Sequence, residues 1–149
     1  MIALELRREV ARQADTLADK AMELLKDLPE HQHDPLTKAQ LNGLLSVANT
    51  AQSIAPIVKF LERQGARREA WQRDRLAGTL LQQVRGLGDY ATRVAEQVQQ
   101  RLHGRHRRRD QEVEALTEKG GRLPEIHHLL ALEFIQSFAA GYLYRYSKE

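Results

Sequence analysis

The stretch EIHHLLALEFIQSFAAGYLYRYSKE, residues 125–149, is apolar on almost every side when it is wound as a helix. A helix without a polar face has to be buried, so this segment predicts a central rod that other helices surround. Pro124 suits the first turn of such a helix, because no intrahelical donor is lost there. We therefore expect an all-α, single-domain helical bundle with a buried C-terminal helix whose core includes Leu130, Phe134 and Phe138.

Apolar residues at helical steps also run through the rest of the chain, and the alternation typical of half-buried strands is absent. The first run predicts one helix over residues 2–28, which Pro29 ends. The polar stretch PEHQHDP, residues 29–35, then forms a linker between two prolines. The apolar stripe of the first helix consists of Ile2, Leu6, Val10, Ala14, Leu17, Ala21, Leu24 and Leu28.

The second run predicts a helix over residues 37–65. Thr37 and Gln40 fit a capping box, in which the hydroxyl and the amide satisfy free backbone N–H groups. Pro56 interrupts the run and predicts a kink or a split, and Gly65 predicts the end of the helix. The apolar stripe consists of Leu41, Leu44, Leu45, Ala48, Ala51, Ile54, Ala55, Val58 and Leu61.

A third run keeps its helical phase through Gly86 and Gly88. This favours one long helix over residues 67–103, bent near the glycines, and leaves a hairpin at that point as the alternative. A short helix is expected in the following stretch, around Val113 and Leu116. Together the segments predict one domain of five or six helices spanning residues 1–149.

The composition excludes several classes of protein. The sequence has no cysteine, which excludes disulfides and cysteine-ligated metal sites and suits a reducing, cytoplasmic environment. The N-terminal stretch MIALELRREVARQ mixes charges into its apolar residues and is unlike a signal peptide. No run of about 18 apolar residues is present, so we expect neither a membrane-spanning helix nor a membrane partner.

No motif predicts an enzyme or a cofactor, because the P-loop, dinucleotide-binding, nucleophile-elbow and HExxH patterns are all missing. His103 and His106 have the spacing of two metal ligands on one helix face, but no third ligand converges on them, so we expect no metal site. Of His127 and His128, one is expected to face the core and the other the solvent. An enzyme with an unrecognised histidine-based metal site therefore ranks third as a function, after the RNA-binding and protein-interaction roles described below.

The arginines are the most informative residues. The stretch RLHGRHRRRD, residues 101–110, has five arginines and no acid before Asp110. Guanidinium groups bind phosphate bidentately and keep their charge, so this density predicts contacts with a nucleic-acid backbone. We expect the basic segment at 103–122 to be mobile without a ligand, because like charges repel. The predicted contacts are Arg101, Arg105, Arg107, Arg108 and Arg109.

A second basic cluster, LERQGARREAWQRDR, lies at residues 61–75. Glu62, Glu69 and Asp74 are interleaved with its arginines, so a solvated face with surface ion pairs fits as well as an anion-binding role. Trp71 is interpreted as a packing anchor. The nucleic-acid contacts predicted here are Arg63, Arg67, Arg68 and Arg75.

Three tyrosines follow one another closely near the C-terminus, beside Arg145. On a helix Tyr142 and Tyr146 share a face, whereas Tyr144 points elsewhere. Aromatic rings beside an arginine can stack nucleic-acid bases. Packing at the end of a helix is the favoured interpretation for this group.

Two stretches resemble a known family. LTKAQLNGLLSVANTAQSIAPIVKFLERQG, residues 36–65, is similar to the helix that opens the core of the small subunit of type III (Csm-type) CRISPR effector complexes. FIQSFAAGYLYRY, residues 134–146, is similar to the closing helix of that family, where paired phenylalanines precede small residues and tyrosines.

The resemblance implies a non-catalytic, RNA-binding subunit of an antiviral ribonucleoprotein. Such subunits stack along the effector and contact the backbone of the guide and target RNA without sequence specificity. The implied partners are RNA, other effector subunits and further copies of the chain. The alternative from the residues alone is a helical protein-interaction or adaptor module whose arginine-rich surface binds an acidic protein.

Overall fold

The computed structural model describes residues 2–32, 34–103 and 123–146. Every regular element in these ranges is a helix, and no strand occurs among them. Leu130, Phe134 and Phe138 are fully buried, and all three lie on the C-terminal helix. The predicted all-α bundle around a buried C-terminal helix is confirmed. The helices are α1 (Ile2–Arg12), α2 (Ala14–Lys26), α3 (Lys38–Thr50), α4 (Ala55–Arg67), α5 (Glu69–Gln72), the 3₁₀ helix η1 (Arg73–Arg75), α6 (Leu76–His103) and α8 (Leu123–Tyr146).

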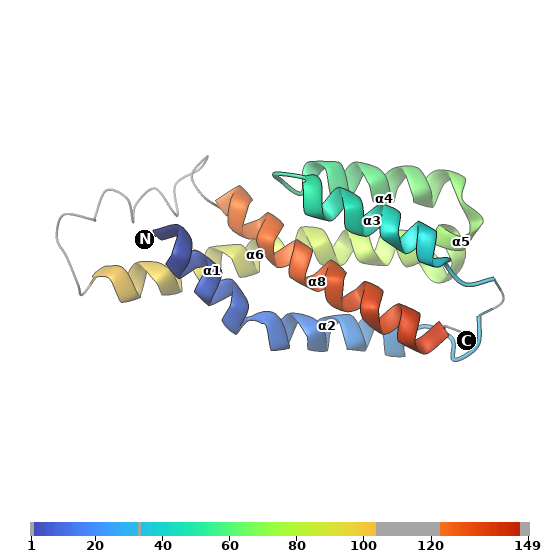
Figure 1. Cartoon of the computed structure of the whole chain (residues 1–149), viewed down its shortest axis with the longest axis horizontal. Coiled ribbons are helices and arrows are strands. Elements are labelled where there is room, and N and C mark those ends of the chain that lie inside the picture. Colours follow the sequence, from blue (N-terminus) through green and yellow to red (C-terminus); the bar gives the residue numbers. More distant parts are fainter. Residues whose placement is uncertain (1, 33, 104–122, 147–149) are drawn as a thin grey trace.

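The C-terminal helix α8 runs through the middle of the bundle and packs against α2, α3 and α6 (Figure 1). The hairpin formed by α3 and α4 lies on one side of it, and α2 lies on the other. Gly141 allows the close approach of α2, since a Cβ at this position would lie 2.5 Å from Leu25 Cδ1. Within the described residues, no helix is both long enough and apolar enough to cross a membrane.

The predicted helix over residues 2–28 is wrong in one respect, because it divides at Gln13 into α1 and α2. The Gln13 N–H contacts both the Glu9 and the Val10 carbonyls, at 3.1 and 3.0 Å, as in a tightened turn. The two halves then pack on different partners, with α1 against α6 and α2 mainly against α8 (Figure 1). The break therefore coincides with a change of packing partner, which the unbroken apolar stripe does not reveal.

The second predicted helix is split rather than kinked, which is one of the two outcomes expected of Pro56. Its N-terminus has the predicted capping box: Gln40 N–H donates to Thr37 Oγ1 at 3.1 Å, and Thr37 N–H donates to Gln40 Oε1 at 2.8 Å. Pro56 lies in the first turn of α4, so the helix phase restarts there and Ile57 is buried instead of Val58. Gly65 does not end the helix; a Cβ there would lie 3.0 Å from Ala77 Cβ, so glycine permits the contact with α6.

The third predicted helix begins nine residues later than expected, at Leu76, and continues through Gly86 and Gly88 to His103. The hairpin alternative is therefore wrong. Residues 69–75 form α5 and η1 instead, and Asp74 and Arg75 have positive φ angles of 52° and 56°. Left-handed backbone is rare outside glycine, and it reverses the chain here between α4 and α6. The short helix expected around 113–116 lies outside the described residues.

Candidate nucleic-acid interface

The predicted contact residues divide into three groups in the structure. Arg105, Arg107, Arg108 and Arg109, together with His106 and nearly all of the basic segment at 103–122, lie outside the described residues. Arg101 lies near the end of α6. The remaining four arginines come from α4, from η1 and from the residue that follows α4.

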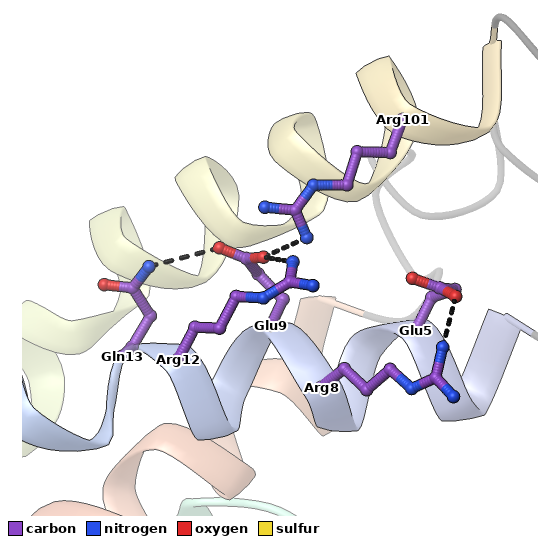
Figure 2. Close-up of polar contacts among 6 residues, drawn as sticks. All are labelled: Glu5, Arg8, Glu9, Arg12, Gln13 and Arg101. Carbon is purple, nitrogen blue, oxygen red and sulfur yellow. Dashed lines mark hydrogen bonds and ion pairs between the residues drawn. The ribbon is translucent and has the colours of Figure 1, made fainter.

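Arg101 is one of three side chains that bind Glu9, with Arg12 and Gln13, and we call these four residues the Glu9 cluster (Figure 2). Arg101 Nη1 lies 2.6 Å from Glu9 Oε2, and Arg12 Nη1 lies 3.0 Å from the same oxygen. Gln13 Nε2 donates to Glu9 Oε1 at 3.2 Å. The Glu9 side chain is only 3% exposed, so these donors replace the water that its carboxylate has lost.

The Glu9 cluster joins α1 to the last turns of α6 (Figure 2). A guanidinium group has five N–H donors, and the Arg101 side chain is 41% exposed. A phosphate at Arg101 would have to use the donors that Glu9 leaves free. Of the contacts predicted over residues 101–109, Arg101 is the one that lies among the described residues, so the Glu9 cluster marks the near end of the predicted RNA site.

Unlike Arg101, the predicted contact arginines of the second cluster have no carboxylate partner among the described residues. The interleaved acids bind groups other than the four predicted contact arginines: Glu62 pairs with Arg85 of α6 at 2.9 Å, and Glu69 pairs with Arg73, the fifth arginine of the cluster, at 3.4 Å. Asp74 Oδ2 accepts a hydrogen bond from Gln32 at 3.4 Å. Four arginines are exposed and have no carboxylate within ion-pair distance in the described ranges: Arg63, Arg67, Arg68 and Arg75.

Three cations follow one another at four-residue steps along α4. Lys59, Arg63 and Arg67 are all exposed, and this spacing places them on one face of the helix. Ile57 and Leu61 are fully buried on the other side of the helix. The sequence interpretation missed Lys59, although its position four residues before Arg63 was a usable signal. We call Lys59, Arg63, Arg67 and Arg68 the α4 basic surface.

A hollow of about 300 Å³ opens beside the α4 basic surface, between α3, α4 and α5. Its apolar wall is Phe60, whose ring meets Trp71 edge to face with centroids 5.9 Å apart. Trp71 is 1% exposed, which confirms its interpretation as a packing anchor. The lining residues are Ala39, Gln40, Gly43, Phe60, Gln64, Arg68 and Trp71.

The tyrosines at the end of α8 pack against the linker between α2 and α3. Tyr142 OH accepts from Leu36 N–H at 2.9 Å and donates to Gln32 Oε1 at 2.7 Å, and Tyr146 OH donates to the Pro29 carbonyl at 2.5 Å. Burial raises the pKa of Tyr142 to about 12, although the Leu36 hydrogen bond acts in the opposite direction. The packing interpretation is confirmed for Tyr142 and Tyr146, whereas Tyr144 is 92% exposed.

Both histidines of α8 bind backbone carbonyls. His128 is buried, as expected for one of the pair, and its Nε2 lies 2.8 Å from the Ala48 carbonyl at the end of α3. His127 does not face the solvent as expected, because its Nε2 lies 2.6 Å from the Val84 carbonyl of α6. The last carbonyls of a helix have no intrahelical donor, so the Ala48 carbonyl is available to the His128 ring. Within the part of the chain that the structure describes, no group of three potential ligands is placed to hold a metal.

Comparison of the chain with protein-family models, with curated proteins and with solved structures gives no match.

Proposed function

We propose that this chain is a non-catalytic RNA-binding protein that grips the phosphate backbone without reading the sequence. The observation that supports this most is the state of the α4 basic surface. Its arginines lack carboxylate partners among the described residues, while the acids next to them in sequence bind Arg85, Arg73 and Gln32.

Such a surface suits an extended polyanion for a physical reason. Like charges at four-residue steps repel one another and disfavour the helix that carries them. The repulsion between Lys59, Arg63 and Arg67 is therefore offset only by packing or by an anionic ligand. Phosphates supply evenly spaced negative charge, and each contact releases counterions from the nucleic acid. Backbone contacts of this kind position a strand but carry no sequence information.

Within this proposal, the chain acts as the small subunit of a type III CRISPR ribonucleoprotein in the cytoplasm, next to other effector subunits and copies of itself. The support is the resemblance of residues 36–65 and 134–146 to that family. The first of these stretches spans α3 and most of α4, and so includes part of the α4 basic surface. In this role the guide RNA supplies sequence recognition, and the arginines supply affinity.

The test is RNA binding as a function of salt, measured by fluorescence anisotropy with two single-stranded RNAs of equal length and unrelated sequence. Five phosphate contacts from Arg101 to Arg109 give a log–log slope of about −3.5, and further contacts at the α4 basic surface steepen it. Replacing Arg107, Arg108 and Arg109 by alanine flattens the slope by about 2. The triple variant Arg63→Ala, Arg67→Ala, Arg68→Ala flattens it by a similar amount, equally for both RNAs.

The matched control replaces Arg8, whose guanidinium pairs with Glu5 at 3.2 Å, and leaves the slope unchanged. If the parent binds neither RNA but binds an acidic peptide, the protein is an interaction module rather than an RNA-binding subunit. A slope that differs strongly between the two RNAs contradicts sequence-independent binding.

A further inference from the structure

The hollow beside the α4 basic surface has the features of a site for a planar ring. Its volume of about 300 Å³ is at the small end of ligand pockets. Phe60 is partly exposed and Trp71 packs edge to face against it, at an interplanar angle of 89°. The buried indole therefore holds the orientation of the phenyl ring that borders the hollow.

Gly43 and Phe60 both line the hollow, and Gly43 has no side chain to occupy it. A Cβ at this position would lie 3.4 Å from Phe60 Cζ and 3.7 Å from Cε2, in contact with the outer edge of the ring, so a longer side chain would take up space beside Phe60. Glycine disfavours a helix by about 1 kcal/mol relative to alanine. Gly43 lies in the interior of α3, where nothing in the backbone geometry requires glycine, and its effect is to keep the hollow open.

Two amide side chains border the hollow with hydrogen-bonding capacity to spare. Gln40 Oε1 accepts from Thr37 N–H at 2.8 Å, which leaves the Gln40 NH₂ group without a partner among the described residues. The Gln64 amide likewise has no side-chain hydrogen bond among the described residues. Amides offer donors and acceptors in one plane, which matches the edge of a nucleobase.

The charge at the rim indicates what the ring is attached to. Arg68 lines the hollow and has no carboxylate partner in the described ranges. Arg67 precedes it, and Arg63 follows Phe60 by one helical step of three residues, on the adjoining part of the α4 surface. A purely apolar ligand in the hollow would gain nothing from these cations, whereas a nucleotide carries a phosphate beside its base.

We propose that the hollow formed by Phe60, Gly43, Gln40, Gln64 and Arg68 receives one unpaired base of a bound RNA strand, with the adjoining phosphate on Arg68. This inference rests on the proposed function and adds a second kind of contact to it. The base lies against the Phe60 ring, and its edge meets the two amides. Stacking of this kind tolerates any base, and each amide offers both a donor and an acceptor, so the contact raises affinity without requiring one particular base.

The experiment compares two oligomers of equal length, a single-stranded RNA and a backbone of the same phosphate count in which every position is abasic. The parent binds the base-bearing oligomer about 10-fold more tightly than the abasic one, with the same salt slope for both. Gly43→Met fills the hollow and abolishes this difference, while its affinity for the abasic oligomer is unchanged. Gly86→Met is the matched control, because a Cβ at Gly86 meets nothing within 4 Å, and it retains the difference.

Replacing helical glycine by methionine does not disfavour the helix, and a thermal melt checks that Gly43→Met folds. Phe60→Leu is the second variant, because it keeps apolar volume but removes the ring face, and it also loses the difference. If the parent binds both oligomers equally, or if Gly43→Met and Phe60→Leu retain the preference, the hollow takes no base and this inference is overturned while the phosphate contacts stand. If the parent binds neither oligomer, the proposed function fails as well.

Discussion

The Glu9 cluster and the α4 basic surface each contain predicted RNA-contact arginines from an arginine-rich stretch, yet these arginines lie in opposite environments. At Glu9, two guanidinium groups approach one buried carboxylate oxygen, at 2.6 and 3.0 Å (Figure 2). On α4, the arginines face outward, and the acids beside them in sequence bind elsewhere. The local density of arginine therefore does not decide its role, because the carboxylate partner comes from another helix.

The largest expected effect comes from removing both guanidinium partners of Glu9. In the double variant Arg12→Ala, Arg101→Ala the buried carboxylate keeps only Gln13, and we expect the free energy of unfolding to fall by about 3–5 kcal/mol. Urea denaturation monitored by circular dichroism measures it. Adding Glu9→Leu to this variant restores much of the loss, because the unpaired buried charge is gone. A loss below about 1 kcal/mol would show that the cluster contributes no more than an exposed ion pair.

A neutral buried contact should give an intermediate effect. Tyr142→Phe removes the acceptor of the buried Leu36 N–H, and we expect a loss of about 1–3 kcal/mol in urea denaturation. Tyr144→Phe is the control, since Tyr144 is 92% exposed, and it should leave stability unchanged. Equal losses in the two variants would contradict the hydrogen bonds between α8 and the linker.

Tyr142 also makes the stability of the fold depend on pH in the alkaline range. Because burial raises the pKa of Tyr142 from 10.0 to about 12, folding favours its neutral form. The resulting stabilisation is complete below pH 10 and is lost as the pH rises toward 12. Ultraviolet titration of the parent minus that of Tyr142→Phe should show one phenol with a midpoint near pH 12. A difference curve with its midpoint at pH 10 would contradict the burial of this hydroxyl.

The smallest expected effect is on the stability of the α4 basic surface. In the double variant Arg63→Ala, Arg67→Ala we expect the free energy of unfolding to rise by no more than about 0.5 kcal/mol at low salt, because the repulsion between like charges four residues apart is removed. The gain should vanish at high salt, where surface charges are screened. Thermal melts at two salt concentrations measure it. A loss larger than about 1 kcal/mol would show that these arginines have structural partners.

The all-α class and the burial of the C-terminal helix could be predicted from the amino-acid pattern alone. Helical periodicity is a local property, and a segment that is apolar on all sides has only one stable place, so Phe134 and Phe138 could be assigned to the core. The capping box at Thr37 and Gln40 was equally predictable, since both of its hydrogen bonds join residues three apart.

The break at Gln13, the late start of α6 and the division into paired and unpaired arginines could not be predicted in this way. The partners of the arginines lie far away in the sequence: Arg101 pairs with Glu9, 92 positions away, and Glu62 of the second cluster pairs with Arg85, 23 positions away. The hollow beside Phe60 likewise requires α3, α4 and α5 to meet. Periodicity shows which face of a helix is buried but not which helix covers it, and the covering helix determines which charges remain unpaired.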